Sequence, residues 1–308
     1  MNSAFWWSDW AYRDGVVSIK STGHQLPLRA KFIAVCLNWL VFYFCMEVWR
    51  IVSLRRKGPR VAFTPQNPRP WYFIWACTHA IGGRIVRDQS KADLTIYFED
   101  TTASPAPEMP HTAAHMNFGC CDVSKTRVAE VFEQTFGYGI AVDPALHVGA
   151  VVEKSEINGA HDGRVLQAPV QAKPGCAYQR LVDNRCSANE VMDYRCVIVG
   201  RDMPLLFIKR REIGKRFTNI NCDVRLVETR EAFSDEETAR LIEFAARMGL
   251  EWGAMDVLRD RNDGRLYVVD VNKTNIDPPI ALPLKDKLKA TKRVANALKQ
   301  FADDHAQG

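Results

Sequence analysis

Apolar residues are unevenly distributed, and the longest uninterrupted apolar run comes early in the chain. Residues 32–46 are uncharged and apolar on all sides of a helix, a pattern typical of a helix that is buried or in lipid. A membrane span needs about 20 apolar residues, so a span would have to continue through Glu47 and Arg50 to residue 54. The basic run Arg55-Arg56-Lys57 would then hold the following chain on the cytoplasmic side. The pattern leaves both alternatives open.

After the Gly58-Pro59 break, the pattern changes to short elements. Residues 60–63 and 92–98 are strand-like, and residues 71–80 between them are helical after proline-rich turns. This order predicts a small parallel α/β layer. A Thr- and Pro-rich linker, residues 101–110, follows it. We therefore expect an N-terminal extension over 1–57 and a separate small α/β domain over 58–119, ahead of a larger domain over 120–302.

The larger domain combines two capped helices with many short strands. A helix is predicted from Ser124 to Phe136 and another from Ser234 to Met248, the second opened by a capping box. Short strands separated by turns indicate an antiparallel α+β arrangement. These strands are predicted over 149–154, 165–168, 177–182, 195–199 and 204–209. A glycine-rich loop, residues 158–163, joins the first two and could either cover phosphates or form an ordinary turn.

The last strands form a predicted hairpin that carries polar side chains. Residues 252–258 and 266–271 are apolar or β-branched, with an Asp-Gly turn between them. Because side chains alternate along a strand, Asp270 and Asn272 share one face, and the partner strand can bring Asp256 beside them. Carboxylate and amide oxygens suit Mg²⁺. The alternative is a hairpin whose polar residues only form its edge or turn.

Composition restricts the function classes. The 308 residues are 47% hydrophobic, so the chain can bury a large core, and the net charge of +5 gives no argument for nucleic acid. The basic clusters 209–211 and 215–216 could face polyphosphate, whereas the lysines of 285–299 are expected on a solvated helix face. Nine cysteines without disulfide or zinc spacing indicate reduced thiols and a cytoplasmic protein.

Several motifs, taken in order over residues 120–280, resemble those of the ATP-grasp superfamily, in the branch of glutathione synthetases and ribosomal-protein glutamate ligases. The matching segments are Ser124-Lys125, Val151-Val-Glu-Lys154, the loop 158–163, Tyr178-Gln-Arg-Leu-Val-Asp183, the D-x-R strand 192–200, Phe207-Ile-Lys-Arg210 leading to Phe217-Thr-Asn219, and Asp256 with Asp270 and Asn272. Three departures stand out: Asp270 replaces the usual Glu, Ser155-Glu156 follows Lys154, and the loop carries His161-Asp162.

The resemblance implies an ATP-grasp fold, with two α+β subdomains gripping ATP, a lid over about 147–183 and a preceding α/β domain. It also implies roles for particular residues. Arg195 and Arg210 would be catalytic, and Asp256, Asp270 and Asn272 would bind two Mg²⁺ ions, or Mn²⁺. The expected ATP-binding residues are Lys125, Lys154, Gly159, Gly163, Gln179, Arg180, Leu181, Val182 and Asp193.

The implied activity is an ATP- and Mg²⁺-dependent, ADP-forming ligase that joins a small carboxylate to an amine, or to a thiol, through an acylphosphate. Two alternatives remain open. The first is phosphorylation of an acceptor without ligation, and the second is a non-catalytic nucleotide-binding protein attached to a membrane through residues 32–54. The expected location is the cytoplasm, with attachment to the cytoplasmic face of the inner membrane as the variant that the apolar run allows.

Overall fold

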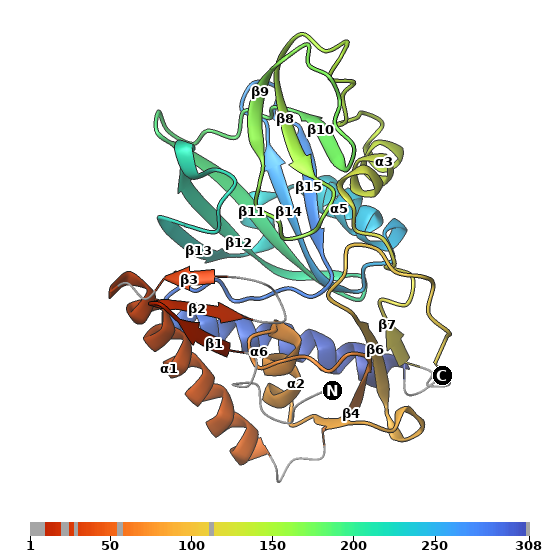
Figure 1. Cartoon of the computed structure of the whole chain (residues 1–308). Helices are drawn as coiled ribbons and strands as arrows, with labels where there is room; N and C mark the ends of the chain where they lie inside the picture. The colour runs from red at the N-terminus through yellow and green to blue at the C-terminus, as the bar shows by residue number, and fades with distance from the viewer. Residues whose placement is uncertain (1–9, 20–24, 28–29, 54–57, 111–113, 306–308) are drawn as a thin grey trace.

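The computed structural model describes residues 10–19, 25–27, 30–53, 58–110 and 114–305, and Figure 1 shows their arrangement. The first elements are three short strands, β1 (Trp10–Arg13), β2 (Val16–Ile19) and β3 (Gln25–Pro27), which form an antiparallel sheet in that order. The sequence pattern predicted no element there. The basic run 55–57 lies outside the described residues.

The apolar run 32–46 lies within helix α1 (Ala30–Ser53), which follows the three short strands. One side of α1 packs on the body of the protein, where Phe42 and Met46 are buried and Tyr43 stacks on Trp75 at 5.7 Å between ring centroids. Leu37 and Phe44 on the other side are exposed. Within the described residues, no helix is both long and apolar enough to cross a membrane. Helix α1 is thus buried on one side only, and its attachment to a membrane stays a prediction.

The small α/β layer is confirmed, with two additional strands. Strands β4 (Arg60–Pro65), β5 (Arg84–Val86), β6 (Leu94–Phe98) and β7 (Ala114–Met116) form a parallel sheet in the order β5-β4-β6-β7. Helix α2 (Phe73–Ala80) packs its apolar residues into the same core, and the short 3-10 helix η2 (Gln89–Lys91) precedes β6. Strands β5 and β7 have three residues each, too few for a recognisable alternation.

A three-stranded antiparallel sheet forms the upper part of the molecule in Figure 1. It contains β8 (Gly149–Ser155), β9 (Arg164–Ala168) and β10 (Cys176–Arg180) in the order β10-β8-β9. Helix α3 (Lys125–Phe136) precedes it; Ser124 Oγ accepts from Arg127 N, and Gly137 ends the helix with φ 77°. Both helix signals predicted from the sequence are confirmed.

The largest sheet has five antiparallel strands in the order β13-β12-β11-β14-β15. These strands are β11 (Glu190–Val199), β12 (Asp202–Glu212), β13 (Asp223–Val227), β14 (Trp252–Arg259) and β15 (Leu266–Asn272). One face packs on α3 and on α5 (Asp235–Arg247), which begins with the predicted Ser234 capping box. The 3-10 helix η3 (Ile213–Lys215) and the single-turn helix α4 (Thr229–Ala232) lie in the connections.

Helix α6 (Leu284–His305) covers part of the other face and joins the two large sheets. Its buried residues Ala290, Val294 and Leu298 share one core with β4, α2 and the lower ends of β11 and β12. Lys285, Lys289, Lys292 and Lys299 are exposed, as expected for a solvated lysine face, and Lys287 is the exception. Lys287 is buried, and its Nζ donates to Asn38 Oδ1 on α1 at 2.5 Å; burial lowers the pKa of Lys287 to about 8.

Candidate active site

The side chains on the α6 face of the five-stranded sheet change from apolar to charged along each strand. On β11, Val199 and Val197 are in the core with α6, and the next two residues with the same orientation are Arg195 and Asp193. On β12, Leu205 and Phe207 are likewise followed by Lys209 and Arg211. Strict alternation therefore places a charged surface on the same face as the apolar core, beyond the end of α6.

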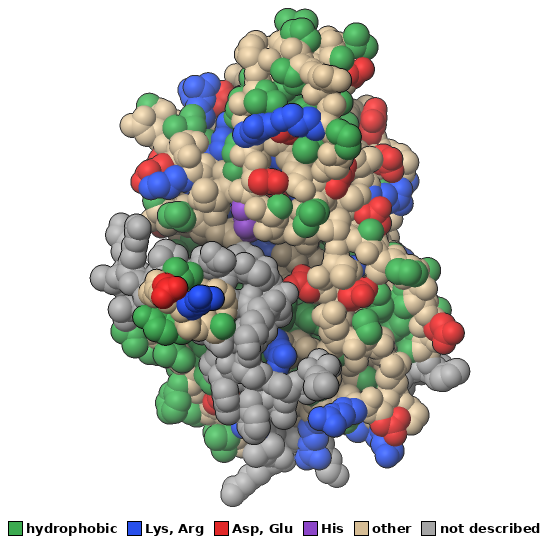
Figure 2. Space-filling model, viewed as in Figure 1, with side chains coloured by type: hydrophobic (Ala, Val, Ile, Leu, Met, Phe, Trp, Pro, Cys, Tyr) green, Lys and Arg blue, Asp and Glu red, His purple; other side chains and the backbone are tan. Residues whose placement is uncertain are grey.

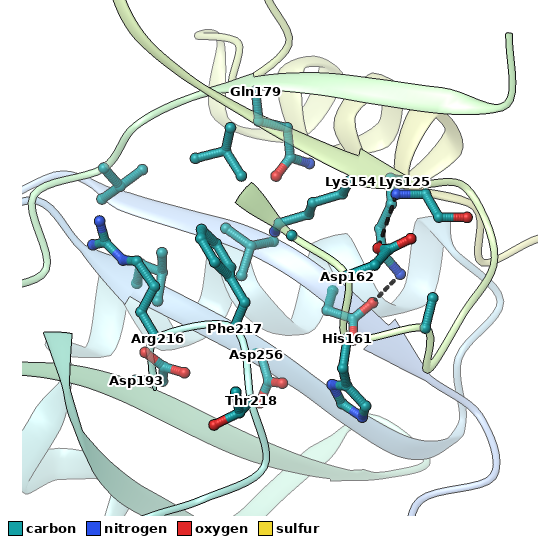
Figure 3. Close-up of a pocket in the computed structure, with 18 of the residues that line it drawn as sticks. Lys125, Lys154, His161, Asp162, Gln179, Asp193, Arg216, Phe217, Thr218 and Asp256 are labelled. Atoms are coloured by element: carbon teal, nitrogen blue, oxygen red, sulfur yellow. Dashed lines mark hydrogen bonds and ion pairs between the residues drawn. The ribbon is translucent and has the colours of Figure 1, made fainter. Parts of the chain in front are cut away.

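A cavity lies between this charged surface and the three-stranded sheet (Figure 3). Figure 3 shows Lys154 and Gln179 entering from the three-stranded sheet, with Asp193 and Asp256 below them. Eleven of the fourteen residues predicted for the site line the cavity: Lys125, Lys154, Gly159, Gly163, Gln179, Arg180, Leu181, Val182, Asp193, Asp256 and Asp270. The three others, Arg195, Arg210 and Asn272, are not among the lining residues.

Two carboxylates face each other across the β14–β15 ladder. Asp256 is the direct partner of Asp270, next to a register shift between Asp256 and Val257. Like charges directly opposed in a sheet are destabilising unless cations compensate them. Here Lys209 Nζ lies 2.8 Å from Asp256 Oδ1, and Lys125 Nζ lies 2.5 Å from Asp270 Oδ1. Two lysines from separate elements thus neutralise the two carboxylates, and the four side chains form one charge cluster.

Arg195 completes the lower side of the cluster. Its Nη1 lies 3.3 Å from Asp256 Oδ2, and its Nε lies 3.2 Å from Asp277 Oδ2. Burial disfavours the charged guanidinium, yet the two aspartates outweigh burial and raise the pKa of Arg195 above its ordinary value. Burial likewise disfavours the Asp256 carboxylate, but Lys209 and Arg195 hold the pKa of Asp256 below its usual range. Both groups stay charged at neutral pH.

The donor set fits Mg²⁺ through two of the three predicted ligands. Mg²⁺ commonly uses one or two protein carboxylates together with substrate phosphates and water, which Asp256 and Asp270 can supply at the cavity wall. Asn272 lies two residues beyond Asp270, where its Oδ1 accepts from Thr274 N at 2.9 Å. Among the described residues there is no group of three or more acidic, Cys or His side chains placed to hold a metal. A metal here would depend on the nucleotide for further ligands.

On β12 the cavity is lined by Arg211 and not by Arg210, the arginine predicted for the site. Arg210 has the opposite orientation to Lys209 and Arg211, because neighbouring strand residues point to opposite faces. Arg211 lines the cavity and pairs through Nη1 with Asp193 Oδ2, whereas Arg210 does not line it. The sequence placed Lys209 and Arg211 in a basic cluster that could face polyphosphate, but only Arg210 of that cluster was assigned a role in the site. The alternation of Leu205, Phe207, Lys209 and Arg211 along one face of the strand is the signal that could have identified them.

Two residues of the three-stranded sheet are suited to binding an anion and a polar ring. Removal of the Lys154 ammonium from water lowers its pKa to about 8, and the neighbouring Asp270 acts in the opposite direction. Gln179 is 2% exposed, and its Nε2 has no hydrogen-bond partner among the described residues. A buried amide without a partner costs free energy unless a ligand accepts from it. Gln179 therefore offers a donor to a bound molecule.

The glycine-rich loop between β8 and β9 contacts the loop after β12 and closes one side of the cavity. His161, with φ 52°, places Nε2 2.7 Å from Asn219 Nδ2. Gly163 lies so close to Phe217 that an added Cβ would be 2.7 Å from the ring. Figure 3 shows Phe217 in the middle of the cavity and His161 beneath the loop. The loop residues therefore act as a cover whose fit requires glycine at position 163.

Comparisons with known proteins agree on the fold. No family model matches the sequence, and no curated protein matches it. The ATP-grasp ligase PsnB, complexed with a minimal precursor, Mg and ADP, is similar with a TM-score of 0.52 and 12% identity, covering 79% of this chain and 98% of that chain. D-alanine–D-alanine ligase from Bacillus anthracis, complexed with ATP, is similar with a TM-score of 0.51 and 9% identity, covering 81% and 99%.

These likenesses define the class to which the fold belongs. The chain has the ATP-grasp fold: two sheets enclose a cavity, and a parallel α/β layer precedes them. The fold expected from the motif order is confirmed. At this level of identity the likeness concerns the fold alone.

Proposed function

We propose that this protein is an ATP- and Mg²⁺-dependent ligase that activates a carboxylate by phosphorylation. The observation that carries the proposal is the opposed pair Asp256 and Asp270, held by Lys209 and Lys125 at the wall of the cavity. A structural ion pair needs one acid and one base, whereas this cluster places two acids and several bases around a cavity. Such an arrangement suits a polyphosphate with its metal.

The nucleotide would lie between the two sheets. The unpartnered Gln179 amide would donate to the base near the 179–182 segment, where Arg180 Nη1 already donates to Tyr267 OH at 2.9 Å. Lys154 and Lys125 would contact the phosphates, and the loop bearing Gly159 and Gly163 would exclude water. Arg211 would hold Asp193 and add positive charge at the same wall.

Asp256 and Asp270 would hold Mg²⁺, which supplies neutralisation of phosphate charge and orientation of the transferred group. The oxygens available suit one or two ions, and Mn²⁺ would bind the same hard donors. Asn272 would contribute only if Thr274 N released its Oδ1.

The chemistry would proceed in two balanced steps. A carboxylate oxygen of the acceptor attacks the γ-phosphorus, the bond to the bridging oxygen breaks, and ADP leaves. An amine then attacks the acylphosphate carbonyl, phosphate leaves, and the amine loses a proton as the C–N bond forms. Lys154, Lys125 and Arg195 stabilise the charge as it shifts to the leaving oxygens. No side-chain nucleophile is needed.

The second substrate is a small carboxylate joined to an amine in the simplest form of this proposal, and the site would work in the cytoplasm, where ATP is available. One structure of the similar PsnB contains a precursor peptide and AMPPNP, with a TM-score of 0.50 and 13% identity. Peptides with acidic side chains therefore belong among the candidates. Carboxylate phosphorylation is common to both classes of acceptor.

The decisive experiment measures ADP release from Mg-ATP with a library of carboxylates and acidic peptides, each with and without added amines. Ligation predicts ADP release that depends on the amine and a product with the mass of the condensed pair. Asp270→Asn should lower turnover by about 10² or more, because it removes a charged group at the reacting phosphates. Asp304→Asn, on the exposed end of α6, is the matched control. Amine-independent phosphorylation of the acceptor would replace the ligase with a simple phosphotransferase.

A further inference from the structure

Helix α1 has a broad apolar face that the described part of the protein leaves exposed. Phe44 is 67% exposed and Ile51 is 57% exposed, although both are large apolar residues. The exposed apolar side chains share one side of the helix, at spacings of three and four: Leu37, Leu40, Val41, Phe44, Val48, Ile51 and Val52. At 3.6 residues per turn they occupy an arc of roughly 120°. A solvent-exposed apolar patch of this extent marks an interaction site.

Charged residues do not interrupt this face. Between Leu37 and Val52 the chain contains only Glu47 and Arg50 as charged residues. Their side chains pair with each other, Arg50 Nε lying 2.7 Å from Glu47 Oε2. The exposed face therefore remains continuously apolar over more than three turns.

The opposite side of α1 is fixed to the body of the protein. Met46 is 1% exposed in the core shared with α2 and α6, and Asn38 accepts from the buried Lys287 at 2.5 Å. Releasing α1 from these contacts would uncover Met46 and leave the Lys287 ammonium without Asn38. The helix can therefore meet a partner along its length while it remains docked on the protein.

The net charge of the protein lies in the part of the sequence that contains this helix. Residues 1–57 contain eight Lys and Arg against three Asp and Glu, and residues 58–308 contain 33 of each. The whole net charge of +5 is thus carried by the N-terminal extension. Three of the basic residues, Arg55, Arg56 and Lys57, come one residue after the end of the helix in the sequence. An apolar helix face flanked by basic residues matches an anionic lipid surface, which attracts each nearby cation.

We propose that α1 binds this protein to an anionic membrane surface, with the helix lying in the plane of the interface and its face from Leu37 to Val52 inserted among the lipid chains. Figure 1 shows α1 at the outer edge of the molecule, and Figure 2 shows hydrophobic side chains along that same lower left edge. The three-stranded sheet that covers the cavity is at the opposite end in Figure 1. Attachment through α1 therefore leaves the cavity open to solvent.

A second copy of the chain is the competing occupant, because Leu37, Val41, Phe44, Val48 and Ile51 follow the alternating spacing of a coiled-coil seam. Two considerations favour lipid. Pairing two extensions would bring two equal positive charges together, whereas anionic lipid neutralises them. Leu40 and Val52 also widen the face beyond a narrow seam.

The test is co-sedimentation of the full chain with vesicles of phosphatidylcholine and phosphatidylglycerol, and with vesicles of phosphatidylcholine alone. We expect binding to the anionic vesicles that weakens on raising the ionic strength. The double variant Phe44→Glu/Val48→Glu should bind the anionic vesicles about tenfold more weakly or worse, because two exposed apolar side chains lose their transfer free energy. Leu146→Glu/Val148→Glu, at exposed apolar positions in the loop before β8, is the matched control and should bind normally.

Melting temperature and light scattering accompany each variant. Since Phe44 and Val48 are exposed, the double variant should melt as the parent protein does. Equal vesicle binding by parent and double variant would overturn the proposal. A parent dimer that the double variant converts to a monomer, with no vesicle binding by either, would overturn it in favour of a second copy. Neither result depends on ATP turnover, so the ligase proposal is tested separately.

Discussion

Lys125 Nζ donates to Asp270 Oδ1 at 2.5 Å, which joins the first turn of α3 to the last strand of the large sheet across 145 residues of sequence. Asp256 is compensated in the same way by Lys209 and Arg195. Both proposed metal ligands thus have cationic partners that belong to the protein. Folding of the cluster does not require a metal, and any Mg²⁺ must compete with these lysines.

This competition leads to the first prediction, which concerns thermal stability. Mg²⁺ alone should raise the melting temperature by less than about 1 °C, because the carboxylates are already paired. Mg-ATP at about 100 times its Kd should stabilise the fold by about 2.7 kcal/mol, or roughly 5 °C or more. ATP with EDTA is the control and should give a smaller shift. A full shift with Mg²⁺ alone would show a metal site that is complete without nucleotide.

The second prediction concerns pH. The pKa of Lys154 is lowered to about 8, so in the free protein its ammonium loses its proton as pH rises through 8. Phosphate favours the charged form, so ATP affinity should fall above pH 8, by up to about tenfold per pH unit, with proton uptake on binding. Titration calorimetry in buffers of different ionisation enthalpy measures that uptake. Lys154→Arg, which stays charged, should bind ATP with little change between pH 7 and about pH 9.

The lowered pKa of Lys154 also makes the stability of the fold depend on pH. Because the folded pKa of Lys154 lies below its ordinary value of 10.5, the unfolded chain binds more protons between pH 8 and 10.5. The contribution of this group to stability therefore increases as pH rises through that window. In Lys154→Arg this contribution should be absent, which chemical denaturation across the window can measure. An equal pH slope in both proteins would contradict the lowered pKa.

The third prediction separates the two neighbouring arginines of β12. Arg211→Lys should weaken ATP binding or turnover by about tenfold, because Lys cannot reproduce the guanidinium contact with Asp193 beside the cavity. Arg210→Lys, on the opposite face, should stay within about twofold of the parent. Both variants keep the positive charge of the side chain. Binding and steady-state assays therefore compare the effect of the same substitution at the two positions. The reverse order of effects would return the role to Arg210.

The fourth prediction concerns the cover of the cavity. Gly163→Ala would place a methyl group 2.7 Å from the Phe217 ring, so the ring must shift and ATP affinity should fall by about tenfold. Adding Phe217→Leu should recover part of that affinity, since the smaller side chain leaves room for the methyl group. Gly214→Ala, which meets no atom within 4 Å, is the control. Non-additive binding energies in this pair of variants would establish the contact.

Local signals in the sequence determined much of the fold. The Ser124 and Ser234 caps depend on neighbours three residues away, and the Asp263-Gly264 turn sets the β14–β15 hairpin. The placement of Asp256 opposite Asp270 follows from that hairpin and strand alternation. Short strands such as β5 and β7 could not be recognised, because three residues form a strand only where a neighbouring strand supplies the hydrogen bonds.

Other features were decided by tertiary structure. Which of Arg210 and Arg211 lines the cavity depends on which face of the sheet packs on α6, because the cavity lies on that face beyond the end of the helix. The partners of Asp256 come from β11 and β12, which are distant in the sequence, so the residues near Asp256 could not predict them. For α1, the sequence shows an apolar helix on every side, but only packing against α2 and α6 divides it into a buried and an exposed face. The apolar composition of a segment determines how strongly it tends to be buried, because the hydrophobic effect has no direction. Which surface it packs against depends on the surfaces that the folded chain places next to it.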